Sequence, residues 1–323
     1  MHFFARAMRS KVVSNALLMV AATTALAGAI SADANAQPLG VGPLVLRLAA
    51  SARLLGMANA GITGNDGDAL FYNPAMLNNA RGMAVSMQRF GSAATSGSLA
   101  SVSQIGTMSI GVGVQFLDWS ATSQSYGTAL HEGASHLSDG GSIPSSSTAI
   151  TLGLVRAYHG HRLGLSAKYV EDRLGAQHDG TIAFDAGVML PSFGFGQLSF
   201  VAQNLGEGLR IGGEKGSLPT RVGIGYGGGM YSAFEKFDFG LQTQLTVERG
   251  RFVRPAGGAE LGYVPIEGVA IIVRAGLRLP KEKDESLATG GLGVTVDRIS
   301  IDYAIEPFRG GRPVSHRLGL RIR

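Results

Sequence analysis

Charged side chains that could do chemistry stand at alternate positions of glycine-rich segments, and they form no compact catalytic motif. Arginines and lysines spaced among carboxylates can pair with one another, because buried charges are normally partnered. They can also contact the polar head group of a substrate moving along an enclosed path. The alternation described below points these candidates toward one interior: Arg162, Lys168, Asp185, Arg221, Glu260, Arg274, Arg278, Asp302, Glu306, Arg317 and Arg321.

Two other groups of polar residues are weaker candidates for a functional site. His131, His136 and Asp139 lie in a serine-rich stretch, and their spacing matches no metal signature. Asp66 and Asp68 in "NDGDA" have too few liganding positions after them for a calcium loop, so a helix cap is the expected role. The sequence has neither a G-x-S-x-G elbow nor a zinc motif. We therefore expect a protein that is not an enzyme and binds no cofactor or metal.

Period-two alternation dominates the chain after residue 81. In the segment 108–116, one face carries Met, Ile, Val, Val and Phe, and the other carries Ser, Gly, Gly and Gln. The pattern recurs in 161–172, 180–190, 237–247 and 268–279. A soluble sandwich would pack the apolar face inward. The opposite face, however, holds small residues and isolated charges where a wet surface would carry runs of Lys and Glu. A transmembrane antiparallel β-barrel, with apolar side chains in lipid, explains this better.

The alternation predicts about fourteen strands, an even number that returns the chain to its starting side. They fall at 82–91, 96–104, 107–118, 146–157, 161–172, 180–190, 196–204, 217–228, 237–247, 253–263, 268–279, 287–297, 298–306 and 314–323. The connection 119–145 is the longest, while connections after even-numbered strands are mostly tight. Long outer loops with short periplasmic turns are typical of outer-membrane barrels. The connection 229–236 is the exception, and a small helix or interfacial aromatic residues would explain its length.

The N-terminal segment 1–36 has the pattern of a secretory signal peptide. Basic residues up to Lys11 precede the apolar stretch 12–30, and "ADANA" offers small residues at a cleavage site before Gln37. The alternative, a transmembrane anchor, lacks a stop-transfer pattern. The chain has no cysteine, so no disulfide can stabilise it. Its +5 charge includes the basic residues of the signal, and we therefore expect no nucleic-acid partner.

The stretch "DALFYNPAML" (68–77) is helix-like, unlike the strands that follow it. Asn73 can cap a helix end, and Pro74 suits the first helical position, where a missing N–H costs nothing. The sequence therefore predicts a short helical prelude before the first strand.

Three stretches together resemble the PorV/PorQ family of outer-membrane proteins, which is grouped with the FadL-type barrels. They are "SARLLGMANAGITGNDGDALFYNPAML", then "FVAQNLGEGLRIGGEKGSLPTRVGIGYG", and then "GGAELGY…IIVRAGLRLP…GGLGVTVDRISIDYAIEPF…SHRLGLRIR". The resemblance implies a fourteen-stranded barrel over 82–323 and an N-terminal hatch over 37–81, with 44–81 folded back inside the lumen. Asn73, Pro74 and Ala75 would then form the helical turn of the hatch. The chain departs from such barrels in ending on Ile322-Arg323, where an aromatic residue is usual.

The resemblance leaves two functions open. In the first, the protein is a non-enzymatic adaptor of type IX-like protein secretion in the outer membrane of a Gram-negative-type envelope, with secretion proteins or exported cargo as partners. In the second, it is a FadL-like importer of hydrophobic small molecules through a hatch-gated barrel. Outer-membrane lipid surrounds the barrel in either case. A narrow, hatch-filled lumen favours the adaptor, whereas an apolar pocket beside an interrupted strand favours the importer. Gly and Pro in "VRPAGGAELG" suggest such a weakened strand.

Overall fold

The computed structural model describes residues 42–91, 94–122, 142–192, 194, 196–211, 214–249 and 252–323. The predicted signal peptide lies outside these residues. So do His131, His136 and Asp139 of the longest connection.

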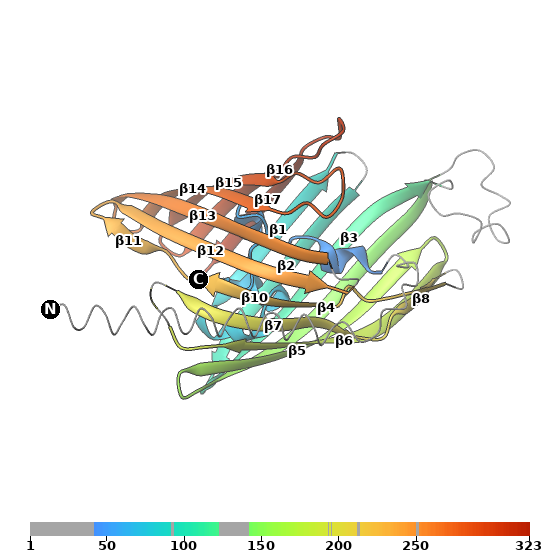
Figure 1. Ribbon diagram of the computed structural model, residues 1–323, viewed down its shortest axis with the longest axis horizontal. Coiled ribbons are helices and arrows are strands. Elements are labelled where there is room, and N and C mark those ends of the chain that lie inside the picture. Colours follow the sequence, from blue (N-terminus) through green and yellow to red (C-terminus); the bar gives the residue numbers. More distant parts are fainter. Residues whose placement is uncertain are drawn as a thin grey trace.

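Fourteen strands of the described chain close into one antiparallel barrel. Each strand pairs with its neighbour in sequence, β17 pairs with β1, and β10 pairs with β12 to complete the ring (Figure 1). The wall strands are β1 (Gly82–Phe90), β2 (Ala94–Ile105), β3 (Met108–Thr122), β4 (Ser142–Tyr158), β5 (His161–Leu174), β6 (Gln177–Met189), β7 (Gln197–Gly206), β10 (Arg221–Gly227), β12 (Phe237–Glu248), β13 (Phe252–Ile266), β14 (Val269–Arg278), β15 (Ala288–Val296), β16 (Ile299–Glu306) and β17 (Ser315–Ile322).

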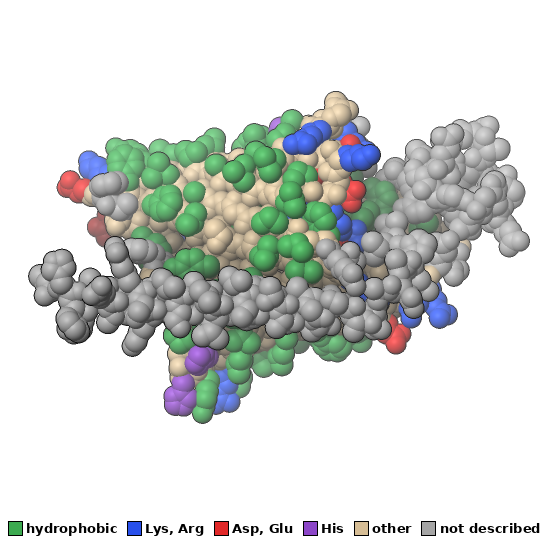
Figure 2. Space-filling model, viewed as in Figure 1, with side chains coloured by type: hydrophobic (Ala, Val, Ile, Leu, Met, Phe, Trp, Pro, Cys, Tyr) green, Lys and Arg blue, Asp and Glu red, His purple; other side chains and the backbone are tan. Residues whose placement is uncertain are grey.

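Alternation along most strands sends apolar side chains outward, as the sequence predicts. On β5, Leu163 and Leu165 are 54% and 64% exposed, while Ser166 and Lys168 between such positions are buried. Figure 2 shows hydrophobic side chains scattered over the outer wall, with few charges between the two ends. This surface suits acyl chains, and the polar face is enclosed. The fold is therefore that of a transmembrane barrel.

Short helices before β1 occupy the barrel interior (Figure 1). They are η2 (Leu44–Arg47), α2 (Ala52–Leu55), η3 (Gly67–Phe71) and η4 (Pro74–Asn79). The predicted cap is confirmed, because the Asn73 side chain accepts a hydrogen bond from the Ala75 backbone N–H at 3.0 Å and Pro74 opens η4. We call this segment, described from residue 42 to 81, the hatch. No helix among the described residues has the length and apolar character to cross a bilayer.

Glycines of the wall bring the hatch backbone close to the barrel. A Cβ atom at Gly164 of β5 would lie 2.2 Å from the Ala75 backbone nitrogen. At Gly276 of β14, the corresponding distance to the Ala58 backbone nitrogen is also 2.2 Å. Because backbone atoms cannot rotate away, only glycine allows this approach. The high glycine content thus reflects an interior filled by the hatch.

Three predictions about the strands are wrong in detail. The predicted strand 217–228 begins only at Arg221, after a separate hairpin of β8 (Leu209–Ile211) and β9 (Glu214–Gly216). The segment 229–236 contains β11 (Tyr231–Phe234), which pairs with β12 just beyond β10, so the eighth wall strand is interrupted. The strand in "VRPAGGAELG", in contrast, pairs with β12 without a break from Phe252 to Tyr263. The interruption thus lies two wall strands away from the predicted position.

Candidate functional site: an ion ring and an apolar cluster

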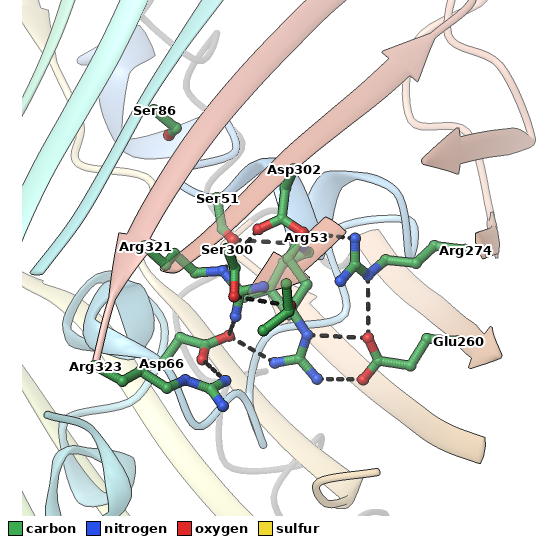
Figure 3. Close-up of polar contacts among 12 residues, drawn as sticks. Ser51, Arg53, Asp66, Ser86, Glu260, Arg274, Ser300, Asp302, Arg321 and Arg323 are labelled. Carbon is green, nitrogen blue, oxygen red and sulfur yellow. Dashed lines mark hydrogen bonds and ion pairs between the residues drawn. The ribbon is translucent and has the colours of Figure 1, made fainter. Parts of the chain in front are cut away.

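Six buried charges form a closed ring that joins the hatch to the barrel wall (Figure 3). We call it the ion ring. Its members alternate in sign, and each carboxylate contacts two guanidinium groups of the ring. In ring order they are Arg53, Glu260, Arg274, Asp302, Arg321 and Asp66. The Nη1 atom of Arg274 lies 2.7 Å from Asp302, and the Nε atom of Arg321 lies 2.7 Å from the same carboxylate.

The hatch supplies two members of the ion ring and the wall supplies four. Arg53 of α2 contacts both Glu260 on β13 and Asp66, whose Oδ2 atom lies 2.8 Å from Arg53 Nη1. Arg321 on β17 closes the ring at 2.5 Å from Asp66. All six side chains are almost fully buried, so each charge depends on its neighbours for compensation. The three positive and three negative members balance, and the ring therefore holds the hatch against β13, β14, β16 and β17.

Asp66 does not have the predicted capping role. It stands at the N-cap position of η3, but its side chain makes no capping hydrogen bond. Its carboxylate instead binds Arg53, Arg321 and the side chain of Arg323. Arg323 thus contacts the hatch.

The other predicted interior charges form smaller groups. Lys168 Nζ lies 2.8 Å from Asp185 and donates to Asn204 at 3.0 Å. Arg278 pairs with Glu306 and, at 3.0 Å, with Glu285. These contacts agree with the expectation that interior charges are partnered.

Three arginines of the predicted set make no close contact with a carboxylate among the described residues. Arg221 donates to Gln203 at 2.7 Å. Arg317, fully buried, donates to Gln88 and to the hydroxyl groups of Ser86, Ser96 and Ser98. Arg162 is partly exposed, and its Nη1 atom has no hydrogen-bond partner in the described chain. On these neighbouring strands, Asp302 thus pairs with Arg321 and not with Arg317.

An apolar cluster that the sequence did not predict lies near the end of the barrel where β3 and β4 are joined by the longest connection. Its buried members come from the hatch, from four neighbouring strands and from the segment around the β8–β9 hairpin. They are Val45, Leu46, Leu117, Ala149, Val170, Ala183, Leu209 and Leu218. Trp119 and three other apolar residues pack against it. The available signal was apolar residues at inward positions, such as Leu117 on β3 and Val170 on β5, where neighbouring inward residues are polar or glycine.

Asp68 of the hatch is buried, and its Oδ1 atom has no hydrogen-bond partner among the described residues. It lies on η3, outside the membrane-spanning strands. Burial raises the pKa of this carboxyl to about 6, and the neighbouring negative charge of Asp66 adds to the shift, while a hydrogen bond from Ser51 opposes it. The protonated form is therefore the one that the hatch favours.

Stability of the hatch is expected to fall as pH rises from about 4 to about 6. A carboxyl whose pKa is higher in the folded state stabilises that state only while it is protonated. In the unsubstituted protein, the parent, the free energy of opening the hatch should therefore fall by about 1 kcal/mol between pH 5 and pH 7.5. In Asp68→Asn this loss should vanish. Hydrogen exchange of hatch amides at the two pH values measures it, with Asp284→Asn at an exposed carboxylate as the control. An Asp68→Asn protein with the parent's pH dependence would contradict this assignment.

Comparisons with known proteins show similarity in structure alone. No family model and no curated protein matches the sequence. The toluene transporter TodX of Pseudomonas putida matches with a TM-score of 0.53 and 11% identity over 81% of this chain and 95% of its own. The toluene transporter TbuX of Ralstonia pickettii has a TM-score of 0.54 and 13% identity, over 86% and 100%. A FadL homologue of Pseudomonas aeruginosa has a TM-score of 0.53 and 9% identity, over 87% and 98%.

These matches cover nearly the whole length of each transporter. They agree with the closed ring of fourteen strands and with the direction of the alternation. The narrower resemblance to PorV/PorQ proteins stays a prediction. The fold of this chain is that of the FadL-type transmembrane β-barrels.

Proposed function

We propose that the protein is an outer-membrane channel for hydrophobic small molecules, with the apolar cluster as its binding site. The observation that carries the proposal is the cluster itself, because apolar side chains from four adjacent strands meet the hatch near the end of the barrel where β3 and β4 are joined. Apolar walls with few polar groups are typical of sites for small apolar ligands. The toluene transporters of the same fold support this class of ligand.

The hatch contacts the wall differently on two sides of the proposed channel. The ion ring fixes the hatch against β13 to β17. On the opposite side, η4 meets β4, β5 and β6, where Leu70 and Leu77 contact the inner face of Gly153. No ion pair joins η4 to these strands among the described residues. A ligand leaving the apolar cluster would therefore pass along β4 to β6, where moving side chains costs less than separating buried charges.

The secretion adaptor is the second candidate. A lumen that the hatch fills, with most of its charges paired, is the observation that favours it, since such an interior suits a structural component. Co-purification from detergent-solubilised outer membrane separates the two candidates. Recovery of secretion proteins without a bound apolar molecule would favour the adaptor.

Iodobenzene, a monoaromatic quencher of tryptophan fluorescence, tests the channel in lipid nanodiscs. Trp119 is the only tryptophan and packs against the cluster, so saturable quenching would report occupancy directly. In Val170→Asn, an amide would face the ligand, and the apparent affinity should fall about tenfold. Ala167→Asn on the outward face of the same strand is the matched control. Quenching that rises linearly and equally in all three proteins would contradict the proposal.

A further inference from the structure

Two basic side chains stand side by side on the outer face of the barrel wall. Arg89 of β1 and His316 of β17 are partners in register, and both are exposed. The next outward residues on the same strands are Met87 and Leu318, which are 56% and 58% exposed. Arg89 and His316 thus border the apolar belt directly. Neither side chain has a carboxylate within 4 Å in the described part of the chain.

A loop carrying two more arginines packs over the part of the wall where Arg89 and His316 lie. We call this part of the wall the basic sector. The rings of Phe90 and Phe308 lie 6.5 Å apart, and Pro313 lies against Gly91, where an added Cβ would be 2.9 Å from its Cγ atom. These contacts hold 307–314 beside the β1–β2 turn. Arg309 directly follows Phe308, as Arg89 directly precedes Phe90. Figure 2 shows Lys and Arg side chains, with Asp and Glu side chains among them, at this end of β16 and β17.

Acidic neighbours neutralise only part of this sector. Arg312 pairs with Asp284 at 2.7 Å, and both side chains are largely exposed. Asp118 of β3 faces outward two strands from Arg89, with Thr95 of β2 between them. Within the described chain, Arg309 has no ion-pair partner within 4 Å. Arg89 donates from Nε to the Gly91 carbonyl oxygen at 3.2 Å, and its other donors make no hydrogen bond within the described chain.

The sector lies at the end of the barrel with the longer connections. The β1–β2 turn and the loop 307–314 share this end with the connection 123–141, whereas β13–β14 and β15–β16 are joined by tight turns at the other end. Long loops mark the outer side of such barrels. Tyr303, whose hydroxyl lies 2.7 Å from His316 Nδ1, supplies the aromatic residue common at a membrane interface.

We propose that Arg89, His316 and Arg309 bind the phosphate group of a lipid in the outer leaflet, with its acyl chains lying along β1 and β17. Cations at the edge of an apolar wall attract anionic head groups, and arginine forms bidentate hydrogen bonds with phosphate. The site is on the outer wall and does not depend on what the lumen carries.

Native mass spectrometry of the detergent-solubilised protein tests the site with diphosphoryl lipid A and its dephosphorylated counterpart of matched acyl chains. The parent should retain the phosphorylated lipid preferentially. Each of Arg89→Gln and Arg309→Gln should weaken its retention about fivefold, and the double variant about 25-fold. Arg173→Gln is the control, because Arg173 is an exposed rim arginine already paired with Glu171 at 3.3 Å.

The lipid, and not free phosphate, is the expected occupant. Inorganic phosphate at the same concentration should leave lipid retention unchanged, since the apolar belt supplies the remaining affinity. Circular dichroism of each variant checks that the barrel is folded. Equal retention of both lipids by the parent, an equal loss in Arg173→Gln, or displacement by inorganic phosphate would each overturn the proposal.

Discussion

Asp66→Asn is expected to release the hatch from the wall at a cost of about 3–5 kcal/mol. The substitution removes the negative charge shared by Arg53, Arg321 and Arg323. Two of these guanidinium groups are buried, and an uncompensated buried charge costs far more than the loss of an exposed pair. The remaining members of the ion ring would carry an excess positive charge next to the hatch.

A single cysteine can report this release, because the chain contains none of its own. Ala69 of η3 is completely buried, so a thiol at Ala69→Cys reacts with a maleimide only when the hatch opens. A loss of at least about 3 kcal/mol should raise the labelling rate about a hundredfold. Glu171→Gln, which breaks the exposed pair with Arg173, should leave the rate unchanged. Labelling of Asp66→Asn at the rate of the Ala69→Cys parent would show that the ion ring does not hold the hatch.

Gly276→Ala is expected to displace the hatch by a steric route, with a loss of about 3 kcal/mol. The new methyl carbon would lie 2.2 Å from the Ala58 nitrogen and 2.3 Å from the Met57 carbonyl carbon. Both are backbone atoms, so the whole segment after α2 must move. Denaturant unfolding in detergent measures the loss, and the cysteine at position 69 shows whether the hatch has opened.

Gly290→Ala on the neighbouring strand is the matched control for this substitution. An added Cβ there meets nothing closer than 3.8 Å, and the position faces outward. Its stability should lie within about 0.5 kcal/mol of the parent. A Gly276→Ala protein as stable as Gly290→Ala would contradict the close approach of hatch and wall.

The interior charges show which ion pairs the order of the strands predicts and which it does not. Alternation places Glu260 and Arg274 on inward faces of consecutive strands, and their register makes them direct partners. Arg53 was not predicted, because its nearest ring partner on the wall is 207 residues away. No local pattern indicates which wall strand a short helix will meet. The closed ion ring therefore follows from the packing of the hatch.

The sequence by itself determined the alternation of faces, the number of wall strands and the cap at Asn73, because each depends on neighbours within a few residues. Tertiary structure decided where the eighth strand is interrupted, which side of the hatch is held by charges and where inward apolar residues meet. Val170 and Leu117, on different strands, are isolated exceptions within their own segments. They form a cluster only because the register of β3 to β6 and the returning hatch bring them together.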